Sequence, residues 1–173
     1  MNAIKKFGGE ILPYAIVVGV IFSIGYSFMK WAVYSEKNRP GKQFSIQGQE
    51  HIKVGASHDP YNSNPPTSGP HYEQPAEWGV YEKELPDEQL VHNLEHGGIW
   101  ISYTNISPVI KTELETLAKK YSGSIILTSR EKNPAPIILA SWGRLEELQD
   151  YNKEIIIKFI NNNKNKSPEP LAR

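Results

Sequence analysis

The stretch Asp87–Tyr103, DEQLVHNLEHGGIWISY, predicts a short helix that leads through two glycines into a strand. Asp87 favours a helix start, because its side-chain oxygen can accept a hydrogen bond from an unpaired backbone N–H. The helix is expected to run through about His96 and to stop at Gly97, a residue that suits the left-handed conformation at a helix C-terminus. Ile99–Tyr103 then has the β-branched and aromatic composition of a strand.

Regular elements are predicted on both sides of this stretch. Downstream, Ser107 and Pro108 favour another helix start, since serine caps a helix and proline suits its first position. Upstream, residues 43–55 alternate apolar and polar side chains, which predicts a strand or a hairpin. The other elements expected are strands at Ser124–Thr128 and Ile137–Trp142 and a last helix at about Leu145–Asn161. This order predicts a small single α+β domain with a mixed sheet and two main helices.

The N-terminal part of the chain predicts a membrane anchor. Ile11–Met29 is a run of 19 residues without a charge, and about 20 apolar residues cross a bilayer as a helix. Trp31 follows at the depth where aromatic side chains anchor at a membrane surface. The lipid bilayer is therefore an expected partner. The predicted organisation is a short tail at 1–10, a transmembrane helix at 11–31, a linker at 32–42, an extracytoplasmic domain at 43–163 and a disordered tail at 164–173.

The basic residues around the apolar run give two opposite indications of orientation. Four of them follow the run and two precede it, and a simple count would place the C-terminal side in the cytoplasm. Lys5 and Lys6, however, form the basic region that precedes the apolar part of a signal-anchor. The run is also longer than the roughly 7–15 apolar residues of a cleaved signal peptide. We expect an uncleaved anchor with a cytoplasmic N-terminus and the domain outside.

Charge and sulfur content exclude several classes of function. The chain has 19 basic and 19 acidic residues, but residues 1–42 hold six basic and two acidic ones, which leaves 13 and 17 for the remainder. A mildly acidic domain is a poor match for nucleic acid, which is bound by clustered Lys and Arg. The chain has no cysteine, and its methionines are Met1 and Met29. Disulfides, thiolate metal sites and a thioether-rich Cu(I) site are therefore excluded from the domain.

The histidines predict a metal site. All five lie between His51 and His96, and on a helix His92 and His96 would share one face four residues apart. A proline-rich loop, residues 56–80, presents His71 as the third ligand. The candidate metal ligands are His71, His92 and His96, with His58 and His51 as further candidates. Neutral imidazoles without sulfur suit a zinc or copper(II) ion, so a copper or zinc cofactor is expected.

Two other functions compete with simple metal binding. His92-Asn93-Leu94-Glu95-His96 fits H-x-x-E-H, an inverted zinc-protease pattern. In a metal-dependent hydrolase of this kind Glu95 would be the catalytic residue, acting as general base. In the third possibility the histidines bind no metal and only hydrogen-bond the proline-rich loop to the core of a structural or partner-binding module. The sequence does not identify a protein partner, and it leaves the question of enzymatic activity open.

Four motifs resemble a known family. They are Asn64-Pro65-Pro66-Thr67-Ser68-Gly69-Pro70-His71, Trp78-Gly79-Val80-Tyr81, Val91-His92-Asn93-Leu94-Glu95-His96-Gly97-Gly98 and Ala140-Ser141-Trp142-Gly143-Arg144. Together they make residues 45–163 similar to the domain-of-unknown-function family 3105. The resemblance implies a single-span, membrane-anchored protein with an extracytoplasmic domain. It also implies that His71, His92, Glu95 and His96 belong to one site, but it supplies no activity.

Overall fold

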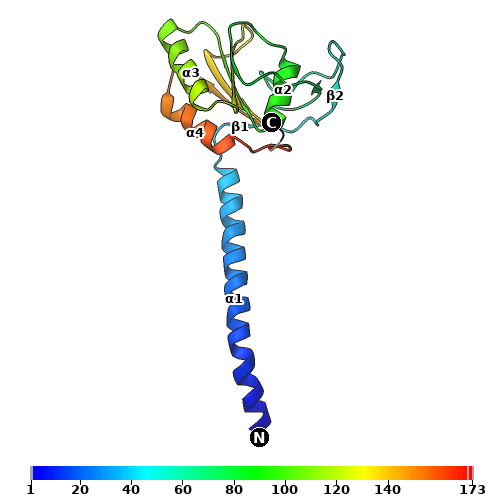
Figure 1. The fold of residues 1–173 in the computed structure, drawn as a ribbon, viewed down its shortest axis with the longest axis vertical. Helices are drawn as coiled ribbons and strands as arrows, with labels where there is room; N and C mark the ends of the chain where they lie inside the picture. Colours follow the sequence, from blue (N-terminus) through cyan, green and yellow to red (C-terminus); the bar gives the residue numbers. More distant parts are fainter. Residues whose placement is uncertain (1, 171, 173) are drawn as a thin grey trace. The chain divides into compact units, whose positions relative to one another are not determined.

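The computed structural model describes residues 2–170 and 172, and for residues 2–13 and 15 it describes the backbone alone. The chain forms two compact units, Met1–Arg39 and Pro40–Arg173. Helix α1 (Asn2–Lys37) makes up the first unit and is drawn in blue in Figure 1.

Helix α1 is longer at both ends than the predicted anchor. The predicted tail is helical from residue 2 to residue 10, and the predicted linker is helical up to Lys37. No glycine or proline interrupts the chain between Lys30 and Pro40, so the helix continues to Lys37, three residues before Pro40, which has no N–H to donate. Within the described side chains, the segment Ile16–Lys37 is long and apolar enough to cross a membrane, with a mean hydropathy of 1.7. The structure does not describe the side chains of residues 11–13 and 15, which belong to the predicted anchor.

The second unit is built on a six-stranded mixed sheet with the order β1-β8-β7-β5-β6-β4. Its strands are β1 (Lys42–Gln43), β4 (Gly79–Tyr81), β5 (Ile99–Tyr103), β6 (Ile125–Ser129), β7 (Ile137–Ser141) and β8 (Arg144–Leu148). Strand β5 is parallel to β6 and antiparallel to β7. The predicted α+β class with a mixed sheet is confirmed. A separate parallel pair is formed by β2 (His51–Ile52) and β3 (His71–Tyr72).

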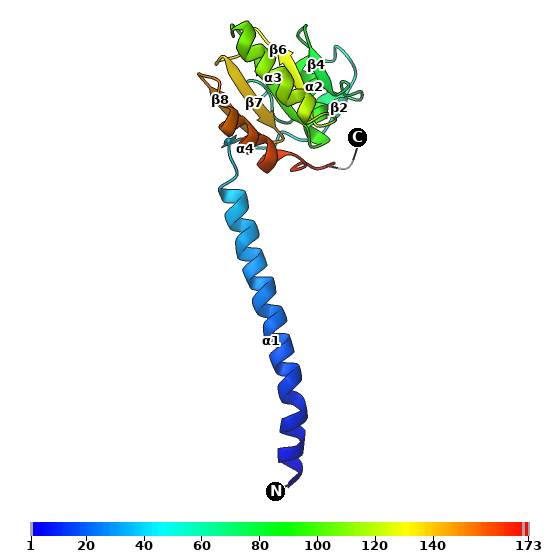
Figure 2. The same cartoon turned by 60° about the vertical axis from the view of Figure 1, so that its left-hand side comes forward.

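Helices cover both faces of this sheet (Figures 1 and 2). They are α2 (Asp87–Glu95) on one face and α3 (Pro108–Lys120) with α4 (Lys153–Asn163) on the other. Successive side chains of β5 alternate between the two layers. Ile99 and Ile101 pack with Leu114 and Phe159, whereas Trp100 packs with α2. Burial of each such side chain contributes about 1.5–3 kcal/mol, so β5 anchors α2 firmly to the sheet.

The prediction of the last helix was wrong at its start. The predicted helix began at Leu145, but residues 144–148 form strand β8, and α4 begins only at Lys153. Gly143 has a φ of 68°, so residues 142–143 make a tight turn that pairs Ser141 with Arg144. Leu145 and Leu148 are three residues apart, a spacing that also suits a helix, and the turn at Gly143 decides between the two.

For residues 43–55 the alternative of a hairpin was wrong, although the region does form two short strands. The segment forms no hairpin, because β1 pairs with β8 and β2 pairs with β3. Gly48, with a φ of 98°, bends the chain between the two short strands. The strand β2 is therefore free to pair with the end of the proline-rich loop, and this pairing places His51 beside His71.

The predicted disorder of residues 164–173 is not borne out where the structure describes them. Asn165 N–H donates to the Gly97 carbonyl at 2.9 Å, and Glu169 N–H donates to the Glu95 carbonyl at 3.1 Å. A polar composition suggests disorder, but these two backbone bonds hold the segment against the end of α2. Residues 171 and 173 of the predicted tail lie outside the described part of the chain.

Candidate metal centre

Helix α2 carries two of the candidate site residues. Leu90 and Leu94 are fully buried against the sheet, which turns His92 and Glu95 towards the proline-rich loop. The helix does not start as predicted, because Pro86 is its N-cap and no side chain caps it. Asp87 instead accepts two hydrogen bonds from Arg130, at 2.9 and 2.8 Å.

The pair β2–β3 brings two further histidines together. His51 lies opposite His71 in the parallel register, and His71 N–H donates to the Glu50 carbonyl at 2.9 Å. The ring of His71 is fully buried, whereas 45% of the His51 side chain is exposed. The cluster therefore has a buried side and one edge that faces solvent.

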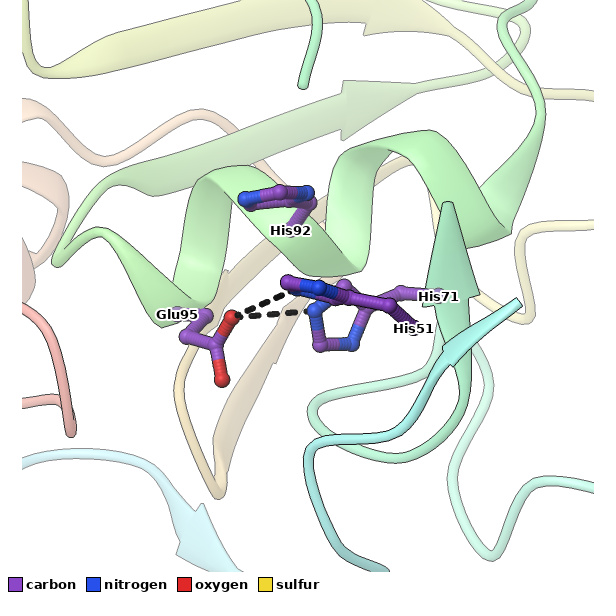
Figure 3. Close-up of side chains that lie close together, drawn as sticks. All are labelled: His51, His71, His92 and Glu95. Carbon is purple, nitrogen blue, oxygen red and sulfur yellow. Dashed lines mark hydrogen bonds and ion pairs between the residues drawn. The ribbon is translucent and has the colours of Figure 1, made fainter. Parts of the chain in front are cut away.

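The three rings and one carboxylate gather in one small region, where His51 stacks on His92 and Glu95 contacts His51 and His71 (Figure 3). The ring centroids of His51, His71 and His92 are 4.8–5.0 Å apart. One nitrogen from each ring and one oxygen of Glu95 all lie within 4.8 Å of one another. We call these four residues the inner group. Ligation of one ion requires donor atoms that gather in this way.

Backbone carbonyls set the tautomers of two rings. His71 Nδ1 lies 2.7 Å from the Gly69 carbonyl oxygen, and His92 Nδ1 lies 2.6 Å from the Tyr72 carbonyl oxygen. A carbonyl oxygen can only accept, so both Nδ1 atoms carry the proton. In the metal-binding form each neutral ring has its lone pair at Nε2, facing the cluster. Without a metal ion, the 2.9 Å contact of His71 Nε2 with Glu95 Oε2 needs a proton on Nε2, because a carboxylate can only accept. Orientation of a ring by a carbonyl in this way is typical of metal-binding histidines.

Glu95 lies at the centre of the polar contacts. Its Oε2 is 2.9 Å from His71 Nε2 and 3.6 Å from His51 Nε2, the two contacts dashed in Figure 3. Its Oε1 accepts a hydrogen bond from Gln49 Nε2 at 2.7 Å. Only 1% of Glu95 is exposed. A buried carboxylate needs such partners, because an unpaired buried charge is costly.

His96 lies at the edge of the inner group. It is the C-cap residue of α2, and its Nε2 is 3.0 Å from His92 Nε2. Its donor atom groups with those of Glu95 and Glu169, and the Glu169 carboxylate is 3.7 Å away. Burial lowers the pKa of both His92 and His96 below the ordinary histidine value, which favours the neutral form that can bind a metal.

The predicted candidate His58 does not join either group of donors among the described residues. Its Nδ1 lies 2.7 Å from the Asp59 carbonyl, its Nε2 lies 3.4 Å from Glu88, and its ring packs on Tyr61. Helix α2 presents Glu88 on its first turn, about one turn before His92. Of the two further candidates, His51 joins the inner group and His58 does not.

Sequence reasoning missed three polar residues around the site. Gln49 holds Glu95, and Glu169 reaches His96 from the C-terminal segment. Asn93 accepts from the Ala76 N–H at 2.9 Å and donates to the Ala76 carbonyl at 2.8 Å, so it ties the proline-rich loop to α2. The sequence did contain a signal for Asn93. It lies between the apolar residues Val91 and Leu94, and a polar amide buried among such residues needs a hydrogen-bond partner.

One comparison with known proteins gives a match. A family model described as a protein of unknown function, DUF3105, matches residues 53–173. The match includes every site residue from His71 to Glu169 and begins just after His51. No curated protein and no solved structure matches the chain. The chemistry of the site must therefore be argued from its side chains.

Proposed function

We propose that this chain, which belongs to the DUF3105 family, is a membrane-anchored protein whose domain binds a divalent zinc or copper ion. The ligands are His51, His71, His92 and Glu95. The observation that carries the proposal is the convergence of their donor atoms within 4.8 Å, with two rings held by carbonyls in the tautomer that directs Nε2 inwards.

The spacing of the donors fits one ion. Bond lengths of 2.0–2.1 Å in a tetrahedral site put neighbouring donors about 3.3 Å apart. The distances from Glu95 Oε2 to the Nε2 atoms of His71 and His51 are 2.9 and 3.6 Å, which lie on either side of that value. Three imidazoles and a carboxylate, with no cysteine in the chain, suit Zn(II) or Cu(II) rather than Cu(I).

The number of ligands favours binding over catalysis. Four protein donors close a tetrahedral site, whereas catalytic zinc sites keep one position open. Both oxygens of Glu95 are already engaged, one with Gln49 and one with His71. We therefore propose that the domain holds, stores or passes on the ion.

The metal test compares matched histidine variants of the full chain in detergent. His71→Ala removes a buried ligand, and His58→Ala removes a histidine outside both donor groups. We expect the wild type and His58→Ala to bind Zn(II) or Cu(II), and His71→Ala to lose the tightly bound ion, as measured by elemental analysis after dialysis. Equal metal in His71→Ala and the wild type would refute the proposal.

A second function, metal-dependent hydrolysis, is favoured by the position of Glu95 beside His71 and His92. In that case the ion would supply Lewis acidity, and Glu95 would accept a proton from water. A Glu95→Gln variant that keeps its metal but loses turnover on a panel of ester, peptide and phosphoester substrates would support it. If the turnover is the same in Glu95→Gln and the wild type, the hydrolase function is refuted.

We propose further that α1 anchors the domain outside the cytoplasm. The apolar segment Ile16–Lys37 supports an anchor, and Lys5 and Lys6 ahead of it support a cytoplasmic N-terminus. A protease added to intact cells should then cleave the domain and spare the N-terminus. Cleavage only after the cells are opened would place the domain inside.

A further inference from the structure

A second set of metal donors adjoins the inner group. One donor atom each from Glu95, His96 and Glu169 lies within 4.8 Å of the others, and we call these three residues the outer group. Glu95 belongs to both groups. We propose that the domain holds two divalent metal ions, one in each group, with the Glu95 carboxylate bridging them. This inference rests on the proposed metal-binding function and extends it.

The number of donors exceeds the needs of one ion. The two groups together contain six residues, and a tetrahedral zinc ion takes four. A single ion in the inner group would leave His96 and Glu169 without a role as ligands. Ions in two-metal sites lie about 3.5–4 Å apart. The Nε2 atoms of His92 and His96 are 3.0 Å apart, a spacing that a single ion would also accept. The assignment of the two rings to two ions therefore rests on their separate grouping, His92 with the inner group and His96 with Glu95 and Glu169.

The C-terminal segment is fixed in place to supply Glu169. Its backbone N–H donates to the carbonyl of Glu95 at 3.1 Å, and Asn165 N–H donates to the carbonyl of Gly97 at 2.9 Å. Asn165 also lies so close to Gly97 that an added Cβ there would meet its backbone at 2.9 Å. The Glu169 carboxylate is consequently held 3.7 Å from His96 Nε2, although the two residues are far apart in the sequence.

The local charge favours a cation at this position. The outer group lies at the C-terminal end of α2, where the helix carries a partial negative charge of about half an electron. Glu95 and Glu169 bring two carboxylates to the same place, and a shared cation relieves the repulsion between them. Two divalent ions carry more positive charge than two carboxylates offset, which favours a small anion nearby. The outer group supplies three donors, so a tetrahedral ion there has one position open for that anion or for water.

Exposure predicts the order in which the two positions fill. His71 and Glu95 are almost completely buried, whereas 15% of the His96 side chain and 54% of the Glu169 side chain are exposed. The outer position offers fewer histidines and is closer to solvent. It should bind its ion more weakly, and the inner position should fill first.

The test is a metal titration of the full chain in detergent with Zn(II) and, separately, with Cu(II). We expect the wild type to bind about two ions per chain, in a tight and a weaker step, and Glu169→Gln to bind about one. Glu131→Gln, which changes an exposed carboxylate on the segment after β6, is the matched control and should bind about two. With Cu(II), the second ion should weaken the electron paramagnetic resonance signal of the first by magnetic coupling.

A second variant distinguishes loss of a ligand from misfolding of Glu169→Gln. His96→Gln removes a different donor of the outer group and should also lose the weaker step and the coupling. About one ion in the wild type and in both variants would overturn the two-ion proposal and leave the inner site standing. Two ions in both variants would overturn it as well. No bound ion in any form would overturn the proposed function itself.

Discussion

At the scale of single residues, the glycines Gly97 and Gly98 allow three segments to meet at the end of α2. Gly97 has a φ of 79°, a conformation that costs other residues roughly 1–2 kcal/mol. A side chain at Gly98 would collide with the Trp78 ring. The two positions therefore let the C-terminal segment and the loop around Trp78 approach the helix end that carries His96.

Gly97 and Gly123 offer a matched pair of substitutions. Both have a positive φ, 79° and 75°, but a Cβ on Gly97 meets the backbone of Asn165, whereas one on Gly123 meets nothing within 4 Å. We expect Gly97→Ala to lower the free energy of unfolding by about 1–3 kcal/mol more than Gly123→Ala, as is usual for overpacking. Urea denaturation of the two variants measures the difference. Equal losses would mean that the C-terminal segment does not pack on Gly97.

At the scale of elements, α2 connects the metal ligands to the core. Leu90 and Leu94 are fully buried, so the position of the helix is set by the sheet. Asn93 then holds the proline-rich loop through both backbone groups of Ala76. The ring of His92 and the carboxylate of Glu95 are thus fixed relative to β3. The ligands are therefore preorganised for metal binding.

The same helix predicts how the metal-free protein responds to pH. Burial lowers the pKa of His92 and His96, so the unfolded chain binds protons at these positions more readily than the folded chain. Their contribution to stability is complete above the unfolded value of about 6.5 and declines as the pH falls from there towards the folded values. Thermal unfolding in the presence of a chelator, between neutral and mildly acidic pH, should show this decline.

The control for this pH dependence is His92→Asn, which removes one of the two groups. Its melting temperature should fall less steeply over the same pH range than that of the wild type. An identical slope in the two proteins would show that His92 does not contribute to the decline.

At the scale of the whole molecule, the metal ligands come from distant parts of the chain. His51, His71 and Glu95 are contributed by β2, β3 and α2, which meet only in the folded domain. A metal ion that binds the folded chain and not the unfolded one stabilises it by mass action. At a free Zn(II) concentration about 100 times Kd the gain should be roughly 2.7 kcal/mol.

This gain predicts a melting temperature that rises by several degrees with Zn(II) and returns to its starting value with chelator. His58→Ala should respond like the wild type, whereas His71→Ala should not respond. If the histidines only hydrogen-bond the loop to the core, as in a non-metal structural module, the wild type would melt at the same temperature with and without the ion.

Local patterns were enough to predict much of the fold. The helix from Pro108, with Ser107 accepting a hydrogen bond from Ile110 N–H, and the strand Ile99–Tyr103 follow from capping and composition. Strand β8 was not predictable in this way, because the spacing of Leu145 and Leu148 suits a helix as well as a strand. The turn at Gly143 and the pairing with β7 settle the choice.

The sequence by itself determined that the chain has an apolar N-terminal helix, an α+β domain, and a donor set of histidines and carboxylates without sulfur. It predicted His71, His92 and His96 as ligands, because a motif within a helix and a rigid loop are local features, and the family resemblance added Glu95 to the same site. Only the tertiary structure decided that His51 joins them, that His58 does not, and that Glu169 reaches His96. These three outcomes depend on the pairing of β2 with β3 and on the docking of the C-terminal segment at Gly97. Such long-range contacts are set by backbone hydrogen bonds and packing, for which residue spacing carries no signal.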